Sequence, residues 1–276
     1  MRVGLMGDMH GNAAALLHAS AQFRAADIDI IVQVGDLGIW PGAKAREMWV
    51  EINGVLARAG QTLLVAPGNH DDYDQIDALR PDADGWLRFT SRVWLAPRGH
   101  RTTLGDKSVL WLGGAGSVDR TWRVQREQEA LGARRLWWPQ EALTAEDVAR
   151  AIAPGHADIM VCHDAPLGVK SIEETLAAKG PSGFEQADLE YAHESREWLD
   201  SVFATVKPSL LVHGHFHFPV DEVVCRDGFE ARIFGLDAEH RPGALAVLET
   251  DDLSIEPLSP AIDGGAQARK SPAFLT

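Results

Sequence analysis

The sequence has few cysteines, no excess of basic residues and no long apolar run. Its 276 residues include two cysteines, Cys162 and Cys225, too few for a disulfide framework in a domain of this size. The 26 lysines and arginines stand against 40 aspartates and glutamates, which gives a formal net charge of −14 at neutral pH. Long nucleic acids are bound by basic faces that displace counterions, so we expect no extended nucleic acid as a partner.

Segments that target or anchor a protein are also missing from the sequence. Val3–Met6 is too short for the apolar core of a signal peptide, and no cleavage site follows it. No apolar run approaches the roughly 20 residues of a membrane span. We therefore expect a soluble, cytoplasmic protein without membrane contact.

The sequence does contain short apolar runs that alternate with longer segments of helical spacing. Val3–Met6 precedes a helical segment at Asn12–Ala26, and Ile28–Val34 precedes another at Ala43–Ala59. This alternation predicts an α/β fold, with strands covered by helices. The further strands expected in this part are Thr62–Ala66, Val93–Leu95, Ser108–Leu112, Ile159–Cys162 and Leu210–Val212.

Short strand-like segments with hairpin turns follow residue 215 and predict a second sheet packed on the first. We expect one domain over residues 1–258 and a flexible C-terminal tail at 259–276, where apolar residues are few. The short segments are Pro219–Val224, Glu230–Phe234, Ala244–Leu248 and Leu253–Pro257.

Residues 117–140 differ from the rest of the acidic chain. They carry five arginines and three tryptophans against three acidic residues. We interpret the segment as an insertion that caps the active site. A helix and loop that only pack on the sheet are the alternative.

Polar side chains follow five predicted strands at their carboxyl ends. Ligands of open α/β sheets bind outside these ends, so we expect the side chains to converge. Aspartate, asparagine and histidine together suit divalent first-row metals better than calcium, which prefers oxygen alone. Seven donors fit two ions. They are Asp8, His10, Asp36, Asn69, His163, His213 and His215.

The spacing within this set indicates how the ions would be held. Asp8 and His10 are two residues apart, so in an extended segment both side chains leave the same face, and His213 and His215 repeat this spacing. A shared carboxylate is the simplest way to hold two cations about 3.5–4 Å apart, and we expect Asp36 to be that bridge. Metal ions at this spacing turn water into a hydroxide nucleophile, so no serine or cysteine nucleophile is needed.

Four further residues are candidates for contact with a substrate. His70 follows the ligand Asn69 and could bind a phosphoryl oxygen or protonate the leaving oxygen, with Asp71 or Asp72 to orient it. His217 continues the spacing of His213 and His215, although a surface position is an equal alternative. Arg120 and Arg123 could form a fork for a phosphate, although for both a purely structural role is the alternative.

These motifs together resemble the calcineurin-like metallophosphoesterase superfamily. The resemblance rests on Gly7-Asp8-Met9-His10-Gly11, Gly35-Asp36, Gly68-Asn69-His70-Asp71, His163 and His213-Gly214-His215, in this order. It implies an α/β/β/α sandwich of two mixed sheets flanked by helices, and it makes His70 the catalytic histidine. It implies one metal held by Asp8, His10, Asp36 and His215. It implies a second metal held by Asp36, Asn69, His163 and His213.

The form of the motifs bears on the substrate. Ser/Thr protein phosphatases of the superfamily carry Asp-Arg-Gly after the second motif, where this sequence has residues Leu37–Gly42 without an arginine. The motifs resemble more closely class III cyclic nucleotide phosphodiesterases and related bacterial and phage phosphodiesterases. We therefore predict a dinuclear metal-dependent phosphodiesterase acting on cyclic nucleotides or small phosphodiesters through a metal-bridging hydroxide.

Several alternatives stay open at this point. The enzyme could be a phosphomonoesterase, including a protein phosphatase, or a nuclease, or the fold could serve as an inactive scaffold. Such scaffolds lack a ligand or the catalytic histidine, and this sequence has all of them. Manganese is the expected metal, with iron, zinc, cobalt and nickel as alternatives. The sequence indicates no oligomeric state.

Overall fold

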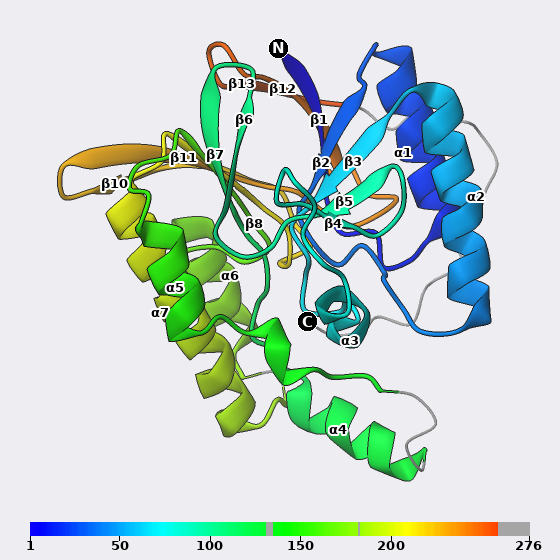
Figure 1. Cartoon of the computed structure of the whole chain (residues 1–276). Coiled ribbons are helices and arrows are strands. Elements are labelled where there is room, and N and C mark those ends of the chain that lie inside the picture. The colour runs from blue at the N-terminus through cyan, green and yellow to red at the C-terminus, as the bar shows by residue number, and fades with distance from the viewer. Residues whose placement is uncertain (131–134, 182, 259–276) are drawn as a thin grey trace.

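A computed structural model describes residues 1–130, 135–181 and 183–258, in which the chain forms two β-sheets between layers of helices (Figure 1). The predicted tail at 259–276 lies outside the described residues, and so do residues 131–134 of the predicted cap.

The first sheet has seven strands in the order β13-β12-β1-β2-β3-β5-β4. The neighbours from β1 through β2 and β3 to β5 pair in parallel, while β12, β13 and β4 add antiparallel pairs. The strands are β1 (Arg2–Met6), β2 (Ile30–Gln33), β3 (Thr62–Val65), β4 (Leu87–Arg88), β5 (Val93–Leu95), β12 (Leu245–Glu249) and β13 (Ser254–Pro257).

The second sheet has six strands in the order β10-β11-β9-β8-β7-β6, again with parallel pairs at its centre. The strands are β6 (His100–Leu104), β7 (Lys107–Leu112), β8 (Ile159–Cys162), β9 (Leu210–His213), β10 (Val220–Arg226) and β11 (Phe229–Gly235). Two sheets are thus present as expected, but the strands after residue 215 do not build the second one by themselves. β12 and β13 return to the first sheet, where β12 pairs with β1.

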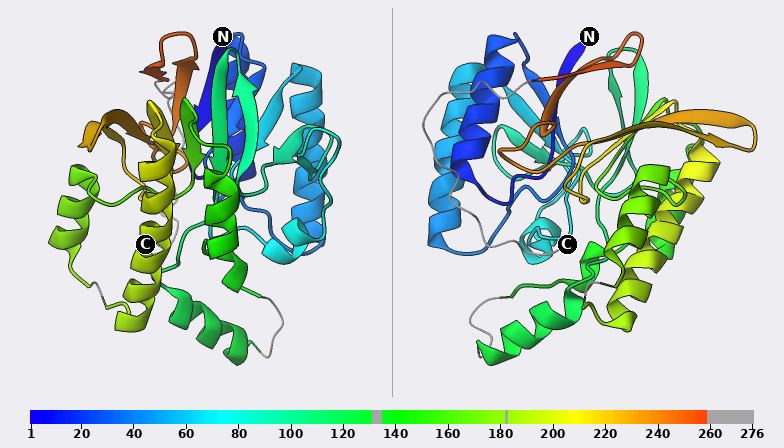
Figure 2. Two further views of the ribbon diagram at one scale, coloured as in Figure 1. Left: turned by 60° about the vertical axis from the view of Figure 1, so that its left-hand side comes forward. Right: turned by 180° about the vertical axis from the view of Figure 1, so that it is seen from behind.

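Helices cover the outer face of each sheet (Figures 1 and 2). α1 (Ala13–Ala25) and α2 (Ala43–Ala59) lie on the first sheet, and Asn12 caps α1 by accepting from the backbone N–H of Ala15 at 3.1 Å. The second sheet is covered by α5 (Ala145–Ile152), α6 (Lys170–Lys179) and α7 (Gln186–Val206). Three short elements complete the fold, namely α3 (Tyr73–Asp77), α4 (Arg120–Glu129) and a 3₁₀ turn at Pro139–Glu141.

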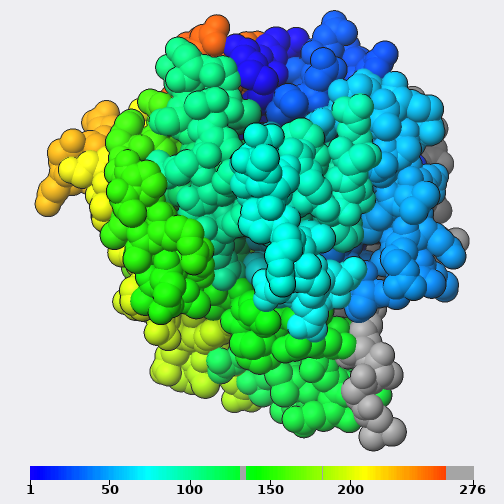
Figure 3. All heavy atoms as spheres, in the orientation of Figure 1, coloured from blue at the N-terminus to red at the C-terminus, as the bar shows by residue number. Residues whose placement is uncertain are grey.

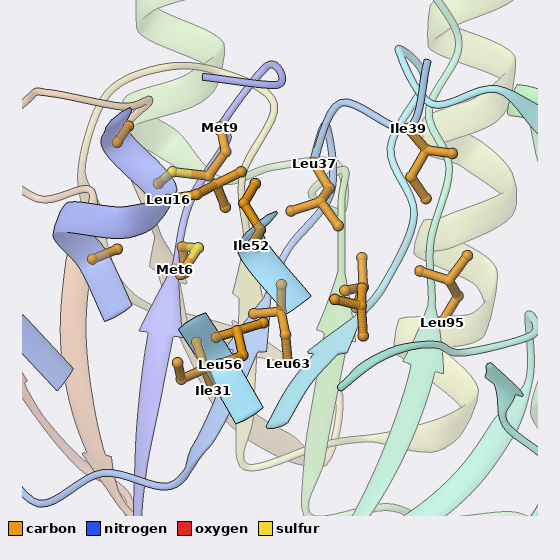
Figure 4. Close-up of a cluster of buried hydrophobic side chains, with 14 of the residues drawn as sticks. Met6, Met9, Leu16, Ile31, Leu37, Ile39, Ile52, Leu56, Leu63 and Leu95 are labelled. Atoms are coloured by element: carbon orange, nitrogen blue, oxygen red, sulfur yellow. The ribbon is translucent and has the colours of Figure 1, made fainter. Parts of the chain in front are cut away.

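Alternation along the strands divides the buried apolar residues into three cores. Met6 and Ile31 pack with Leu16 of α1 between the helices and the first sheet (Figure 4). Val3 and Leu5, on the other face of β1, pack between the two sheets. A third core joins the second sheet to α5, α6 and α7. The order of layers is therefore helix, sheet, sheet, helix.

The carboxyl ends of the central strands meet on one side of the molecule. In every view β1 runs from the labelled N-terminus toward the side where α3 and α4 lie (Figures 1 and 2). The region of α4 forms the lower edge of the space-filling view (Figure 3). The parallel strands therefore deliver their following loops to the place where the predicted site should form.

Trp111→Ala should destabilise the core between the sheets strongly. The side chain is fully buried, its ring lies 5.1 Å from that of Trp86, and its Nε1 donates to Thr102 Oγ1 at 2.8 Å. We expect a loss of about 3–5 kcal/mol in the free energy of unfolding, measured by urea denaturation. Val50→Ala is the control, because Val50 is 75% exposed and should change stability by less than about 0.5 kcal/mol. Similar losses in the two variants would contradict this packing.

Candidate metal centre

The loops at the carboxyl ends of β1, β2 and β9 turn with unusual backbone angles. His10, Asp36, His215 and His217 all have positive φ, between 44° and 69°. Such angles cost non-glycine residues about 1–3 kcal/mol and persist where the surroundings enforce them. The backbone here is held so that these four side chains meet.

Glycines allow these loops to approach one another. A Cβ atom on Gly214 would overlap Oδ1 of Asp8, and one on Gly68 would overlap the backbone nitrogen and the carboxylate of Asp36. The motif glycines are thus needed for close contact between loops. This contact lets the backbone N–H of His70 reach Asp36 and that of His215 reach Asp8.

A first group consists of Asp8, His10, Asp36 and His217, whose candidate ligand atoms all lie within 4.8 Å of one another. Nε2 of His217 lies 3.0 Å from Oδ2 of Asp8, and Nε2 of His10 lies 3.6 Å from Oδ2 of Asp36. Both carboxylates are buried, while the two imidazoles remain partly exposed. Two buried acids and two histidines at this spacing can hold a divalent ion.

A second group lies on the other side of Asp36. Nε2 of His163 is 2.9 Å from Oδ1 of Asn69 and 3.4 Å from Oδ1 of Asp36. The ring of His215 lies 5.0 Å from that of His163. The two oxygens of Asp36 thus face different groups, which is the geometry that a bridging carboxylate requires.

The structure places His213 and His215 differently from the expectation. His213 is the last residue of β9 and shares the face of Leu211, which packs in the core under α6 and α7. Its ring lies 5.7 Å from Phe216 of the same core, and its Nε2 has no hydrogen-bond partner among the described residues. The spacing rule failed because β9 ends at His213 and the chain turns at His215, so the two side chains do not share a face.

His217 and His215 occupy the places expected for His215 and His213. His217, considered as a substrate contact, lies in the first group. His215 lies beside His163 in the second group. The structure thus brings His215 and His217 to the other predicted ligands, two residues further along the chain than the pair predicted from the sequence.

The donor chemistry of the second group fits a cation. Nδ1–H of His163 donates to the carbonyl of Val34 at 2.7 Å, which leaves a lone pair on Nε2. Nδ2 of Asn69 donates to Oγ of Ser117 at 2.9 Å, which leaves Oδ1 as an acceptor. With Oδ1 of Asp36, three acceptor atoms face one another, and a metal ion or a proton can bridge them.

The proton affinities of the site support this interpretation. Burial opposes charge on His163, yet the carboxylate of Asp36 outweighs it and raises the pKa of His163 to about 10. Burial likewise opposes charge on His10, but Asp36 and Glu239 raise the pKa of His10 to about 11. Protons and metal ions compete for the same ligand atoms, so these two imidazoles are suited to a cation, whereas burial lowers the pKa of His215.

His70 lies at the rim of this cluster and is 29% exposed. Its backbone N–H donates to Oδ1 of Asp36 at 2.8 Å, and its Nε2 lies 3.9 Å from Oδ2 of the same carboxylate. Arg123 Nη2 donates to Nε2 of His70 at 2.5 Å. The packing around the ring and the positive charge of Arg123 lower the pKa of His70.

Asp71 and Asp72, considered as partners for His70, are engaged by the backbone. Asp71 accepts from the backbone N–H groups of Gly38, Ile39 and Gly68 at 2.8–3.0 Å, and Asp72 caps α3. Both carboxylates shape loops. The group that contacts the ring of His70 is Arg123 instead.

The two arginines expected to bind phosphate are held by protein groups. Arg123 is 3% exposed and contacts Asp119 at 2.8 Å as well as His70. Arg120 contacts Asp188 on α7 at 2.9 Å and stacks over Tyr191. The predicted cap therefore reaches the site through Arg123, whereas Arg120 ties it to α7.

One residue that contacts the site follows no motif in the sequence. Glu239, in the loop between β11 and β12, lies 2.9 Å from Nδ1 of His10, although 229 residues separate the two. A carboxylate behind a ligating histidine fixes the orientation of the ring and makes it more basic. No local pattern around Glu239 could have indicated this contact.

Comparison with known proteins gives the family. The family model described as calcineurin-like phosphoesterase matches residues 1–219. The chain belongs to this family. It is therefore a metal-dependent hydrolase of phosphoric esters, and the two mixed sheets between helices are the fold of the family. The match ends before Glu239, so this contact to His10 comes from outside the matched region.

Several solved structures are similar to the chain at low identity. An archaeal phosphodiesterase is 11% identical over 94% of this chain and 99% of that chain, with a TM-score of 0.41. A protein of Thermus thermophilus is 11% identical over 94% and 98%, with a TM-score of 0.49. A dimetal phosphatase from Danio rerio is 15% identical over 90% and 91%, with a TM-score of 0.44.

No curated protein matches the chain. Among the described helices, none combines the length and apolar character needed to cross a membrane.

Replacing individual histidines should distinguish the two positions of the histidine pair. We expect His217→Ala to reduce the metal content from two ions per chain to one, because it removes a donor from the first group. His213→Leu should keep both ions, because His213 faces the apolar core. Metal content of dialysed, manganese-loaded protein measures both effects. Loss of an ion from His213→Leu with none from His217→Ala would show that His213 is a ligand and His217 is not, as predicted from the sequence.

Proposed function

We propose that this phosphoesterase is a phosphodiesterase of small substrates, including cyclic nucleotides, and that it binds two divalent ions. One ion would be held by Asp8, His10, Asp36 and His217. The other would be held by Asp36, Asn69, His163 and His215. The facing acceptor atoms of His163, Asn69 and Asp36 are the observation that supports this assignment most directly.

The engagement of the arginines favours a substrate of low charge. A phosphomonoester carries a charge of about −1.5 to −2 at neutral pH, whereas a phosphodiester carries one negative charge. Arg123 is buried among Asp119, His70 and the carbonyl of Asn69, and Arg120 is bound to Asp188. Neither guanidinium is free to bind a second negative charge. A diester has no second negative charge and needs no guanidinium to bind one.

Each part of the site has a defined task in this proposal. Bound divalent ions supply Lewis acidity and lower the pKa of water toward 7, which yields a nucleophile without a protein base. Glu239 holds the ring of His10, and the carbonyl of Val34 holds the ring of His163. The ring of His70 lies beside Asp36, and because its Nε2 accepts from Arg123, its Nδ1–H is the group that can donate to an oxygen of the phosphoryl or leaving group. Arg123 fixes the position of this ring.

We also propose manganese as the metal and the cytoplasm as the location. Mixed imidazole, amide and carboxylate donors accept several first-row ions, and iron, zinc, cobalt and nickel are the alternatives for a metal analysis. Both cysteines are free, which is consistent with a reducing compartment.

Paired model substrates test the proposed activity. With manganese bound, the protein should hydrolyse bis-p-nitrophenyl phosphate faster than p-nitrophenyl phosphate, and 2′,3′- or 3′,5′-cyclic nucleotides should be cleaved as well. The release of p-nitrophenol and of nucleoside monophosphates measures both activities. Faster hydrolysis of the monoester would make the protein a phosphomonoesterase. No diester hydrolysis with manganese, iron, zinc, cobalt or nickel would refute the proposal.

His70→Ala should separate catalysis from metal binding. The ring touches Asp36 only at 3.9 Å and is partly exposed, so its removal should leave the metal content unchanged. Turnover of the diester should fall by roughly 10²–10⁴-fold, the usual effect of a positioned acid–base group. Steady-state kinetics beside metal analysis of the same sample measures both. Unchanged turnover would remove His70 from the mechanism.

A further inference from the structure

Two buried residues outside the proposed ligand set form a hydrogen-bonded relay to Asn69. Ser117 lies at the start of the segment that carries α4, and Glu141 ends the 3₁₀ turn that closes it. Oγ of Ser117 is 2.9 Å from Nδ2 of Asn69 and 2.7 Å from Oε2 of Glu141. Asn69, Ser117 and Glu141 are each at most 2% exposed, so water does not compete for these contacts.

The relay has a direction that follows from the number of hydrogens available. An ionised carboxylate only accepts, and Glu141 takes the backbone N–H of Ser117 on Oε1 at 2.8 Å and its hydroxyl on Oε2. The hydroxyl has one hydrogen, so its oxygen must accept from Asn69. The amide nitrogen of Asn69 therefore faces Ser117. Its oxygen faces His163 and Asp36.

The orientation of this amide decides whether Asn69 can bind a metal. The amide oxygen carries lone pairs, whereas the NH₂ group carries two donors and cannot ligate a cation. Without a fixed partner, both orientations of the group would be accessible. We propose that Ser117 and Glu141 are positioning residues that hold the oxygen of Asn69 toward the metal site, an inference that rests on the ligand set proposed above.

The position of Glu141 supports this role over simple packing. A carboxylate without exposure is costly to bury, and Nη1 of Arg123 lies as far as 4.0 Å from Oε2 of Glu141. Burial raises the pKa of Glu141 to about 7 against the effect of Arg123. The carboxylate of Glu141 is thus buried at a cost in free energy, at a position where it orients the hydroxyl of Ser117. An apolar residue would fill the same space at lower cost.

Glu141→Gln is the sharpest test because it changes shape very little. The glutamine oxygen would accept the backbone N–H of Ser117, so its NH₂ group would face the hydroxyl and reverse the direction of the relay. Titration of metal-free protein with Mn²⁺, at a pH well above 7 so that Glu141 is ionised in the wild type, measures the effect. We expect one of two binding steps to weaken about 10–100-fold and the other to keep its affinity.

Ser117→Ala provides a second variant, since it removes the hydroxyl without altering Glu141. Ser20→Ala is the matched control, because Ser20 is also buried and its hydroxyl donates to Gln61 at 2.6 Å, far from the site in the α1 layer. Ser117→Ala should weaken the same step as Glu141→Gln, and Ser20→Ala should weaken neither. The absorption spectrum of the Co²⁺-loaded protein should change in the first two variants alone.

Glu141→Gln made in an Asn69→Asp variant distinguishes an effect on the orientation of the residue 69 side chain from a general effect on packing. Aspartate has an oxygen on both sides of its side chain, so one oxygen faces the metal in either orientation. Glu141→Gln should therefore cost less than about threefold in Mn²⁺ affinity in this background. An equal loss in both backgrounds would overturn the proposal, because it would reveal a general packing effect.

These measurements do not depend on which ester is cleaved. If the wild type binds two ions but hydrolyses no diester, the proposed substrate class fails and the relay is still tested. If Glu141→Gln and Ser117→Ala both bind two ions with wild-type affinity, the relay fails even when diester hydrolysis is found.

Discussion

The carboxylate of Asp36, buried at the junction of the two sheets, is the constraint on which the rest of the site depends. A charge that is 1% exposed must be compensated by its neighbours. The histidines on either side lower the pKa of this carboxylate, and divalent ions would compensate its charge more completely. Because its two oxygens face different groups, one carboxylate organises both halves of the centre.

Holding this carboxylate in place requires unfavourable backbone geometry in several loops. Asp36 itself, His10, His215 and His217 all have positive φ, and Gly214 and Gly68 leave no room for a Cβ atom. The three apolar cores offset these costs, because they fix the strands that lead into the loops. The well-packed sandwich and the strained loops therefore depend on each other, with stability concentrated away from the site.

Much of the architecture could be predicted from the sequence, because apolar periodicity and motif spacing are local properties. The strands at Val3–Met6 and Ile159–Cys162 and the helix at Ala43–Ala59 lie close to where the patterns placed them. Which sheet β12 and β13 join could not be read, since that depends on the pairing with β1 across the whole chain. The family and the two-sheet fold followed from the ordered motifs.

The site was predictable in kind and less so in detail. Asp8, His10, Asp36, Asn69 and His163 converge as their positions after strands suggested. His217 joins the first group and His215 lies beside His163, because alternation holds only inside a strand and β9 ends at His213. Glu239, Ser117 and Glu141 could not be found, because hydrogen bonding between residues far apart in sequence leaves no local pattern.

The pairing of β1 with β12 has a consequence for the folding of the protein. Arg2 lies beside Glu249 in the register, so β1 pairs with a strand that is far from it in the sequence. Glu239 shortly precedes that late strand and reaches back to His10 near the start of the chain. Contacts of such long sequence separation form slowly. All of the proposed ligands and Glu239 precede β12 in the sequence. The strand that leads to Asp8 and His10 is nevertheless paired on both sides only when β12 joins it, so this late strand helps to hold the first group in place.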